Sequence, residues 1–222
     1  MTHHSKECRA GFNNITYLTQ IVPSLFTAMT VGAAAENPVV YGVNANAFVV
    51  KGGQLVEIVI NNYDVGVHPM HIHGHAVQLV ARSPGNFTPP TPKQHHHHGQ
   101  SGQPKMQANA MGYDGDTSKM PRIPMRRDTW MVAGSGYTVL RFIADNPGVW
   151  FIHCHMEWHI EAGLAAMIIE DPLGLQKTQT IPDAANMQCQ SQNIPTQGNA
   201  AGNTVNYTDL TGANTVCPAL SQ

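Results

Sequence analysis

The sequence predicts an all-β protein, and two observations support this class. Short runs rich in β-branched and aromatic residues recur along the chain, separated by Gly, Asn or Pro. Only residues 23–31 and 156–163 have a pattern that hints at a helix. Many short strands at regular spacing are typical of a β-sandwich or barrel, so we expect one domain of this architecture.

The first expected strands are AFVV (47–50) and LVEIVI (55–60), which flank the turn residues Lys51-Gly52-Gly53. Apolar runs between Gly, Asn and Pro continue this pattern toward the C-terminal third of the chain. The remaining expected strands are residues 75–81, 128–134, 137–145, 148–155 and 164–171.

Residues 83–124 interrupt this pattern with a long insert that is rich in Pro, Gly, Gln and His. The insert includes the run His95–His98, and we interpret it as a solvated loop rather than a site. Residues 176–222 are rich in Asn, Gln and Thr, and we expect an irregular tail. The domain itself is expected at residues 12–175, after a leftover segment at residues 1–11.

The composition excludes several classes of protein. The 222-residue chain has a formal net charge of −2, so neither a nucleic-acid surface nor a polybasic membrane patch is expected. Its four cysteines are too few for a disulfide scaffold, and the sequence does not choose a pairing for Cys8, Cys189 and Cys217. Three N-glycosylation sequons begin at Asn14, Asn86 and Asn206 and favour an extracellular location.

Two dense clusters of metal-binding residue types lie on either side of the insert. One is HPMHIHGH, from His68 to His75, and the other contains His153, Cys154, His155 and His159. Because side chains alternate faces along a strand, His71 shares a face with His73, as His153 does with His155, and Cys154 points the other way. The spacing therefore predicts two adjoining sites, one with sulfur and one with imidazoles only.

One thiolate with two imidazoles is the donor set of a blue-copper site. His68 and His159 are the members of the clusters that remain to complete such a site with Cys154. Taken alone, a His-x-His pair is usually structural or a zinc pair, and a buried Cys is usually a small apolar residue. Two such clusters together favour copper over zinc, because structural zinc sites usually have more than one Cys.

The motifs HPMHIHGH and HCHMEWHIEAGL resemble the copper motifs in the last cupredoxin domain of multicopper oxidases. The stretches FNNITY, VPSLFTAMTVG, PMRRDTW and ADNPGVWFIHCHMEWH are similar to fungal iron-uptake ferroxidases in particular. The resemblance runs from about Phe12 to Gly212 apart from the insert. It implies a cupredoxin-like Greek-key β-sandwich or barrel in an oxidase that couples one-electron oxidation of Fe(II) to four-electron reduction of O₂ to water.

The resemblance also implies a role for each candidate residue. Leu164 takes the place of an axial Met and does not coordinate, and His75 lies beside the ligands. The implied copper ligands are His68, Cys154 and His159 at type 1, His71 at type 2, and His73, His153 and His155 at type 3.

Asp64, four residues before His68, is the candidate iron-docking residue, because Fe(II) prefers hard oxygen ligands. An Asp occupies this position in the resembling ferroxidases. The alternative is that Asp64 only caps a turn after Asn61-Asn62. The alternative functions are a laccase-like phenol oxidase domain and a stand-alone cupredoxin that carries electrons or holds copper.

The type 2 and type 3 coppers of the family also need four histidines from a first domain, and this chain has no further His-x-His pairs of that kind. We therefore expect a third domain of a longer oxidase, or a partial gene product, whose partners are the N-terminal cupredoxin domains, O₂ and an iron permease. The chain has no apparent signal peptide or membrane anchor, and the expected location is extracellular or the outer face of the plasma membrane.

Overall fold

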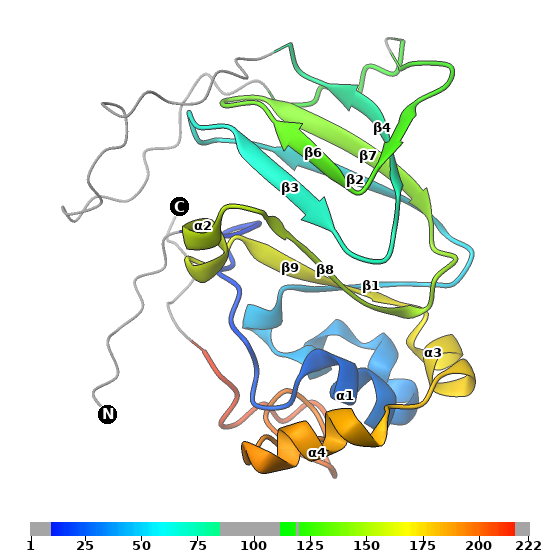
Figure 1. The fold of residues 1–222 in the computed structure, drawn as a ribbon, viewed down its shortest axis with the longest axis vertical. Helices are drawn as coiled ribbons and strands as arrows, with labels where there is room; N and C mark the ends of the chain where they lie inside the picture. Colours follow the sequence, from blue (N-terminus) through cyan, green and yellow to red (C-terminus); the bar gives the residue numbers. More distant parts are fainter. Residues whose placement is uncertain (1–9, 85–111, 119, 216–222) are drawn as a thin grey trace, which may run out of the picture. The chain divides into compact units, whose positions relative to one another are not determined.

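The computed structural model describes residues 10–84, 112–118 and 120–215, and this part of the chain forms nine β-strands in two sheets, with short helices and loops between them (Figure 1). The strands are short, as the sequence pattern predicts, and the expected all-β class is confirmed. The strands are β1 (Ala47–Val50), β2 (Leu55–Asn61), β3 (His68–Ile72), β4 (Val77–Arg82), β5 (Met125–Arg127), β6 (Thr129–Val132), β7 (Tyr137–Ile143), β8 (Gly148–Cys154) and β9 (Ala165–Glu170).

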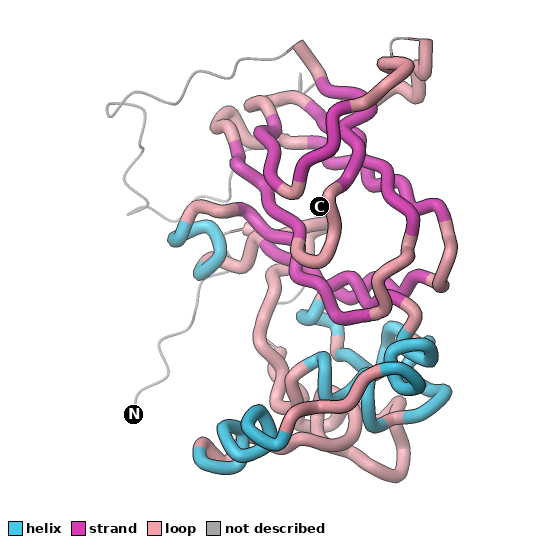
Figure 2. The backbone as a smooth tube through the Cα atoms, turned by 45° about the vertical axis from the view of Figure 1, so that its right-hand side comes forward, coloured by secondary structure: helices cyan, strands magenta, loops and turns pink. Residues whose placement is uncertain are grey.

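The helices of the described residues are all short (Figure 2). The two helices hinted at by the sequence are α1 and α2. The set is α1 (Ser24–Thr30), η1 (Gly32–Glu36), η2 (Pro38–Tyr41), η3 (Val43–Ala45), α2 (Glu157–Glu161), α3 (Pro172–Thr178) and α4 (Asp183–Ser191). No helix in this part of the chain is long and apolar enough to cross a membrane.

Helix α4 differs from the expected irregular tail. It has the sequence DAANMQCQS and no buried residue, so it lacks the apolar stripe by which a helix is recognised in a sequence. It begins directly after Pro182, a residue type that is tolerated where a helix starts. The limits of 12–175 for the domain stay a prediction.

The chain divides into two compact units. Among described residues, the first contains residues 10–54, 144–153 and 158–215. In this unit β1 pairs with β9 in parallel, and β9 pairs with β8 in antiparallel orientation.

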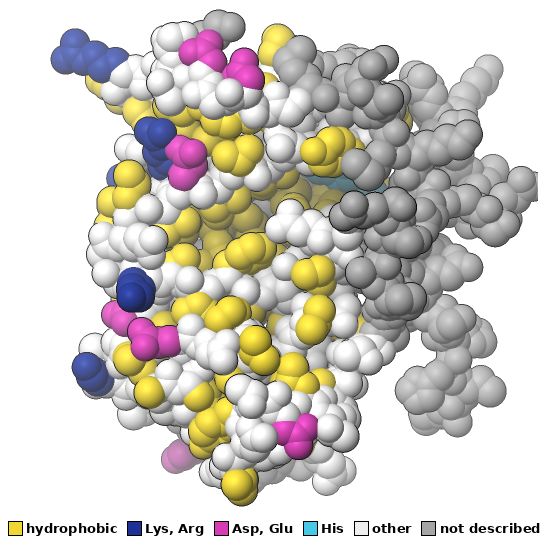
Figure 3. Space-filling view, turned by 180° about the vertical axis from the view of Figure 1, so that it is seen from behind, with side chains coloured by type: hydrophobic (Ala, Val, Ile, Leu, Met, Phe, Trp, Pro, Cys, Tyr) yellow, Lys and Arg dark blue, Asp and Glu magenta, His cyan; other side chains and the backbone are white. Residues whose placement is uncertain are grey.

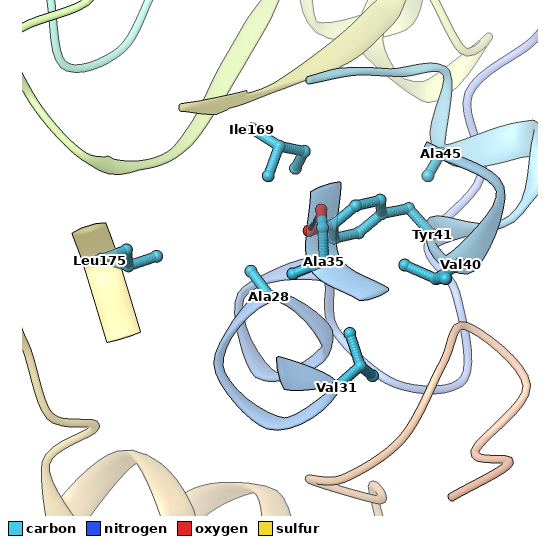
Figure 4. Close-up of a cluster of buried hydrophobic side chains, with 8 residues drawn as sticks. All are labelled: Ala28, Val31, Ala35, Val40, Tyr41, Ala45, Ile169 and Leu175. Carbon is cyan, nitrogen blue, oxygen red and sulfur yellow. Dashed lines mark hydrogen bonds between the residues drawn. The ribbon is translucent and has the colours of Figure 1, made fainter. Parts of the chain in front are cut away.

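The first unit has its own apolar core, shown in Figure 4. Tyr41 lies within it, and its hydroxyl donates a hydrogen bond of 2.8 Å to the carbonyl of Ala35, which satisfies the buried phenol. The cluster joins α1, the three 3₁₀ turns, β9 and α3. Its members are Ala28, Val31, Ala35, Val40, Tyr41, Ala45, Ile169 and Leu175.

The second unit contains the described residues of 55–143 and residues 154–157. Strands β2, β7, β4 and β5 form an antiparallel sheet in that order, and β4 has an irregularity between Leu79 and Ala81. Strands β3 and β6 pair in antiparallel orientation, with His68 opposite Val132. Helix α2 begins in this unit, and its remaining residues belong to the first.

Charged side chains are sparse on the protein. On the face in Figure 3, Lys, Arg, Asp and Glu are scattered among apolar and neutral side chains. One cross-strand ion pair links Arg141 on β7 to Glu57 on β2 at 2.6 Å.

Candidate metal centre

Strand β3 separates the histidines of the first cluster as the sequence predicts. Burial alternates along the strand, so that His68, Met70 and Ile72 are buried whereas Pro69 and His71 are only partly buried. His68 and His71 therefore point to opposite faces. One strand contributes ligands to two different environments.

Cys154, the last residue of β8, is fully buried. Its Sγ lies 3.6 Å from Nδ1 of His68. Ligand atoms of His68, Cys154 and His159 all lie within 4.8 Å of one another. The residues predicted for the sulfur-containing site are thus brought together.

Asp64 contacts one member of this cluster, His68. Its Oδ2 lies 3.1 Å from Nε2 of His68, while Nδ1 of the same ring faces Cys154. Because the carboxylate binds the Nε2 proton, the neutral imidazole has its lone pair on Nδ1, toward the thiol. Asp64 thus selects the tautomer and fixes the orientation of His68.

The two groups also shift each other's pKa. Burial lowers the pKa of His68, but hydrogen bonds with Asp64 and Cys154 outweigh it and raise this pKa to about 9. The hydrogen bond with His68 holds the pKa of Asp64 at about 2. In the absence of metal, the pair is therefore a carboxylate and an imidazolium at neutral pH.

The turn that the alternative for Asp64 invokes is present, but the carboxylate does more than cap it, since it also binds His68. Its backbone N–H donates to Oδ1 of Asn62 at 2.9 Å, and its carbonyl accepts from the N–H of Ser135 at 2.7 Å. The turn holds the backbone and leaves the carboxylate to bind His68. Its side chain is 55% exposed, so it is accessible from solvent.

Three of the four histidines predicted for the imidazole site also lie together. The ring centroid of His71 is 4.9 Å from that of His73 and 6.0 Å from that of His155. His73 and His155 are exposed. The group holds no thiol and is open to solvent, in contrast to the cluster at Cys154.

His71 is oriented by the start of β6. Its Nδ1 lies 2.9 Å from the carbonyl oxygen of Asp128 and 3.4 Å from Oγ1 of Thr129. A carbonyl oxygen only accepts, so Nδ1 carries the hydrogen and Nε2 has the lone pair that a metal needs. Neither Asp128 nor Thr129 is among the candidate residues that the sequence predicts for this site.

The remaining candidates are placed as follows. His153 lies on β8 with its ring 4.9 Å from that of Phe151, and His75 packs on Phe142 at 4.4 Å. The backbone N–H of Leu164 donates to the carbonyl of His159 at 2.9 Å, which ties the predicted axial residue to a predicted ligand. The run His95–His98, the sequon at Asn86, Cys8 and Cys217 lie outside the described residues.

One buried thiol and two imidazoles within 4.8 Å suit copper, because one thiolate with two imidazoles is the donor set of blue-copper sites. Residues 17–174 match the Multicopper oxidase family. The chain belongs to this family. The family uses copper, and the His68–Cys154–His159 cluster fits a type 1 site.

Relatives and solved structures agree with this membership. The chain is 43% identical over 206 residues to "Iron transport multicopper oxidase FET3" of Candida albicans and 44% identical to the protein of that name in Gibberella zeae. Each match covers 92% of this chain but only 30% of the relative. This member of the family therefore spans about a third of the length of those proteins.

The structure titled "Crystal Structure of Fet3p, a Multicopper Oxidase that Functions in Iron Import" matches with a TM-score of 0.76 and 40% identity. The match covers 93% of this chain and 37% of that one. A laccase from Botrytis aclada matches with a TM-score of 0.50 and 27% identity, over 69% of this chain and 24% of the laccase. The cupredoxin-like fold predicted from the sequence is confirmed.

Proposed function

We propose that this chain is the copper-binding domain of an iron-oxidising multicopper oxidase, with the type 1 site and part of the trinuclear site. The enzyme would couple one-electron oxidation of Fe(II) to four-electron reduction of O₂ to water. The observation that carries the proposal is the contact of the solvent-accessible Asp64 with His68, whose other nitrogen faces Cys154. The carboxylate of Asp64, which is accessible to a metal-ion substrate, is thus connected to the buried Cys154 through the imidazole of His68 alone.

His68, Cys154 and His159 would hold the type 1 copper, which when bound supplies a one-electron acceptor. Asp64 keeps Nδ1 of His68 directed at this cluster. Its side chain also offers a hard oxygen ligand at the surface, which suits Fe(II) better than the thiol does. Asp64 would therefore both position a ligand and dock the substrate.

His71, His73, His153 and His155 would supply half of the imidazoles of the oxygen-reducing cluster. Cys154 is covalently adjacent to His153 and His155, so only a few bonds separate the thiol from either ring. The other half of the ligands would come from N-terminal cupredoxin domains. The exposure of His73 and His155 supports such a partner, because metal ligands open to water await further donors.

For the location we propose the extracellular space or the outer face of the plasma membrane, as a secreted glycoprotein, with an iron permease as a partner that takes up the product. The sequons support this. Asn206 and Asn14 are both exposed, and Oγ1 of Thr208 donates to Oδ1 of Asn206 at 2.9 Å. Glycan analysis of Asn206 in protein from the native host tests the location.

The test of substrate compares Asp64→Ala with wild type in the complete oxidase, on Fe(II) and on a bulky phenol. We expect the rate on iron to fall severalfold while phenol oxidation holds or rises. The matched control is Asp183→Ala, which removes an exposed carboxylate from α4 and should leave both rates unchanged. Equal loss on both substrates would mean that Asp64 supports only the copper site, and the laccase-like alternative would then be favoured.

A further inference from the structure

The turn after helix α2 fixes the backbone between His159 and Leu164. The N–H of Leu164 donates to the carbonyl of His159 at 2.9 Å, and the N–H of Gly163 donates to the carbonyl of Ile160 at 2.9 Å. Gly163 has a φ of 96°. This pair of bonds around a left-handed residue is a Schellman cap, in which the first and sixth residues are tied together. The spacing of five residues between His159, the predicted ligand, and Leu164, the predicted axial residue, is therefore set by the cap that ends helix α2.

Gly163 is also in close contact with a segment far away in the sequence. A Cβ at this position would lie 2.3 Å from Cγ2 of Thr16, 3.0 Å from the backbone nitrogen of Tyr17 and 3.1 Å from its carbonyl oxygen. The N–H of Tyr17 donates to the carbonyl of Gly163 at 3.0 Å. The segment Thr16–Leu18, which we call the clasp, thus lies against the capped turn with no space for a side chain.

The clasp also forms hydrogen bonds with residues other than Gly163. Oγ1 of Thr16 donates to the carbonyl of Ala10 at 2.9 Å. Nδ2 of Asn44 donates to the carbonyl of Thr16 at 2.8 Å, and the N–H of Leu18 donates to the carbonyl of Asn44 at 2.8 Å. Asn44 is buried, so these bonds are not readily exchanged for water. The clasp therefore resists displacement and keeps the turn in place.

The clasp reaches a second ligand-bearing element through an aromatic ring. The ring of Tyr17 meets Phe151 edge-on at 5.0 Å between centroids, and Phe151 packs on His153 at 4.9 Å. Phe151 and His153 are both on β8, directly before Cys154. One short segment is thus in contact with the turn after His159 and with the strand that leads to Cys154.

We propose that Thr16–Leu18 and Gly163 form a positioning device for the metal centre, which sets where His159 and Leu164 lie and so tunes the reduction potential of the site. This rests on the proposed function, which assigns His159 to the type 1 copper, and on the resemblance to the family, which implies that Leu164 is the axial residue. The physical reason is that an axial neighbour and the orientation of ligands tune such a site. The clasp and Gly163 coordinate nothing and act only through the backbone of the turn.

The experiment is Gly163→Ala in the complete, copper-loaded oxidase, measured by the red absorption band and the parallel copper hyperfine splitting in the EPR spectrum. We expect the splitting and the midpoint potential to shift while one type 1 copper is still bound. The control is Gly212→Ala, which has a φ of 91° but no atom within 4 Å of the added Cβ. It has the same backbone strain without the contact, and its spectrum should equal that of wild type.

A second variant locates the contact. Thr16→Ser removes Cγ2 and keeps the hydroxyl that binds Ala10, so adding it to Gly163→Ala should return the splitting part of the way to wild type. If Gly163→Ala does not fold, Thr16→Ser alone should produce a smaller shift of the same splitting. An unchanged spectrum in folded Gly163→Ala, or in Thr16→Ser if that is the variant measured, would overturn the proposal. A wild-type protein without the red band would instead overturn the proposed function, and the inference with it.

Discussion

The two histidine groups of this molecule differ in burial and in completeness. Cys154 and His68 are buried, and their ligand atoms converge with that of His159 to within 4.8 Å. His71, His73 and His155 approach one another by their rings, but His73 and His155 are exposed. The first group brings a full donor set from within this chain, whereas the second offers imidazoles to solvent.

This difference shows how one strand can serve two sites. On β3, His68 is oriented by a carboxylate, and His71 by a backbone carbonyl. A buried site depends on partners within the chain, because an unpaired polar group in the interior is costly. An exposed site can await ligands from another domain, since water solvates its imidazoles until then.

The largest effect is expected from a substitution in the buried group of His68, Cys154 and His159. Cys154→Ser removes the thiolate and should abolish the intense red absorption of the copper-loaded protein, while the far-ultraviolet circular dichroism keeps its β signature. The matched variant is His73→Ala, which alters only the exposed group and should leave the colour intact. A Cys154→Ser protein that stays blue would refute the assignment.

The next prediction concerns the number of metal ions held by this chain by itself. After loading with copper and dialysis against a moderate chelator, we expect about one copper per chain, because the exposed imidazoles supply only half a cluster. The triple variant His71→Ala/His73→Ala/His155→Ala should retain the same amount. Sustained O₂ uptake by the isolated chain, or loss of copper in the triple variant, would contradict the prediction that only the buried group binds copper in the isolated chain.

A smaller effect follows from the ion pair in the metal-free protein. Because the pKa of His68 is raised from 6.5 to about 9, its contribution to stability is full below pH 6.5 and is lost as the pH rises through about 9. Because the pKa of Asp64 is lowered from 3.8 to about 2, its contribution is present above pH 3.8 and is lost as the pH falls through about 2. Asp64→Asn should therefore lower the thermal midpoint most between about pH 4 and 6.5, and least above pH 9. A difference that is constant from pH 5 to 10 would exclude this pair as its cause.

The smallest expected effect tests the support of the exposed group. Thr129→Val removes a hydroxyl that lies 3.4 Å from Nδ1 of His71 and donates to Oδ1 of Asp128 at 3.0 Å, but it leaves the carbonyl of Asp128 in place. The free energy of unfolding, measured with urea, should change by less than about 1.5 kcal/mol, because the first contact is long and the second is exposed to water. A larger loss would show that Thr129 carries more of the fold than its position at the start of β6 indicates.

The sequence predicted most of the strands and the grouping of His68 with Cys154, because both depend on the alternation of side chains along short runs, but β3 and β5 were not among the expected strands. It could not show the contact of Asp64 with His68, since a four-residue spacing in a loop does not fix a side-chain direction. It also missed helix α4, whose nine residues bury nothing. The association of Thr16 and Tyr17 with Gly163 depends on residues about 145 positions apart, which no local pattern reveals.

The cap after α2 is built from backbone atoms, so the side chain of residue 164 takes no part in the hydrogen bonds that hold it. Substitution there would leave these backbone hydrogen bonds in place and change only the side chain. If Leu164 is axial to the copper, as the resemblance to the family implies, Leu164→Met would add a weak thioether ligand and lower the potential without redesign of the loop. A single codon change could then match the copper site to a stronger or weaker electron donor.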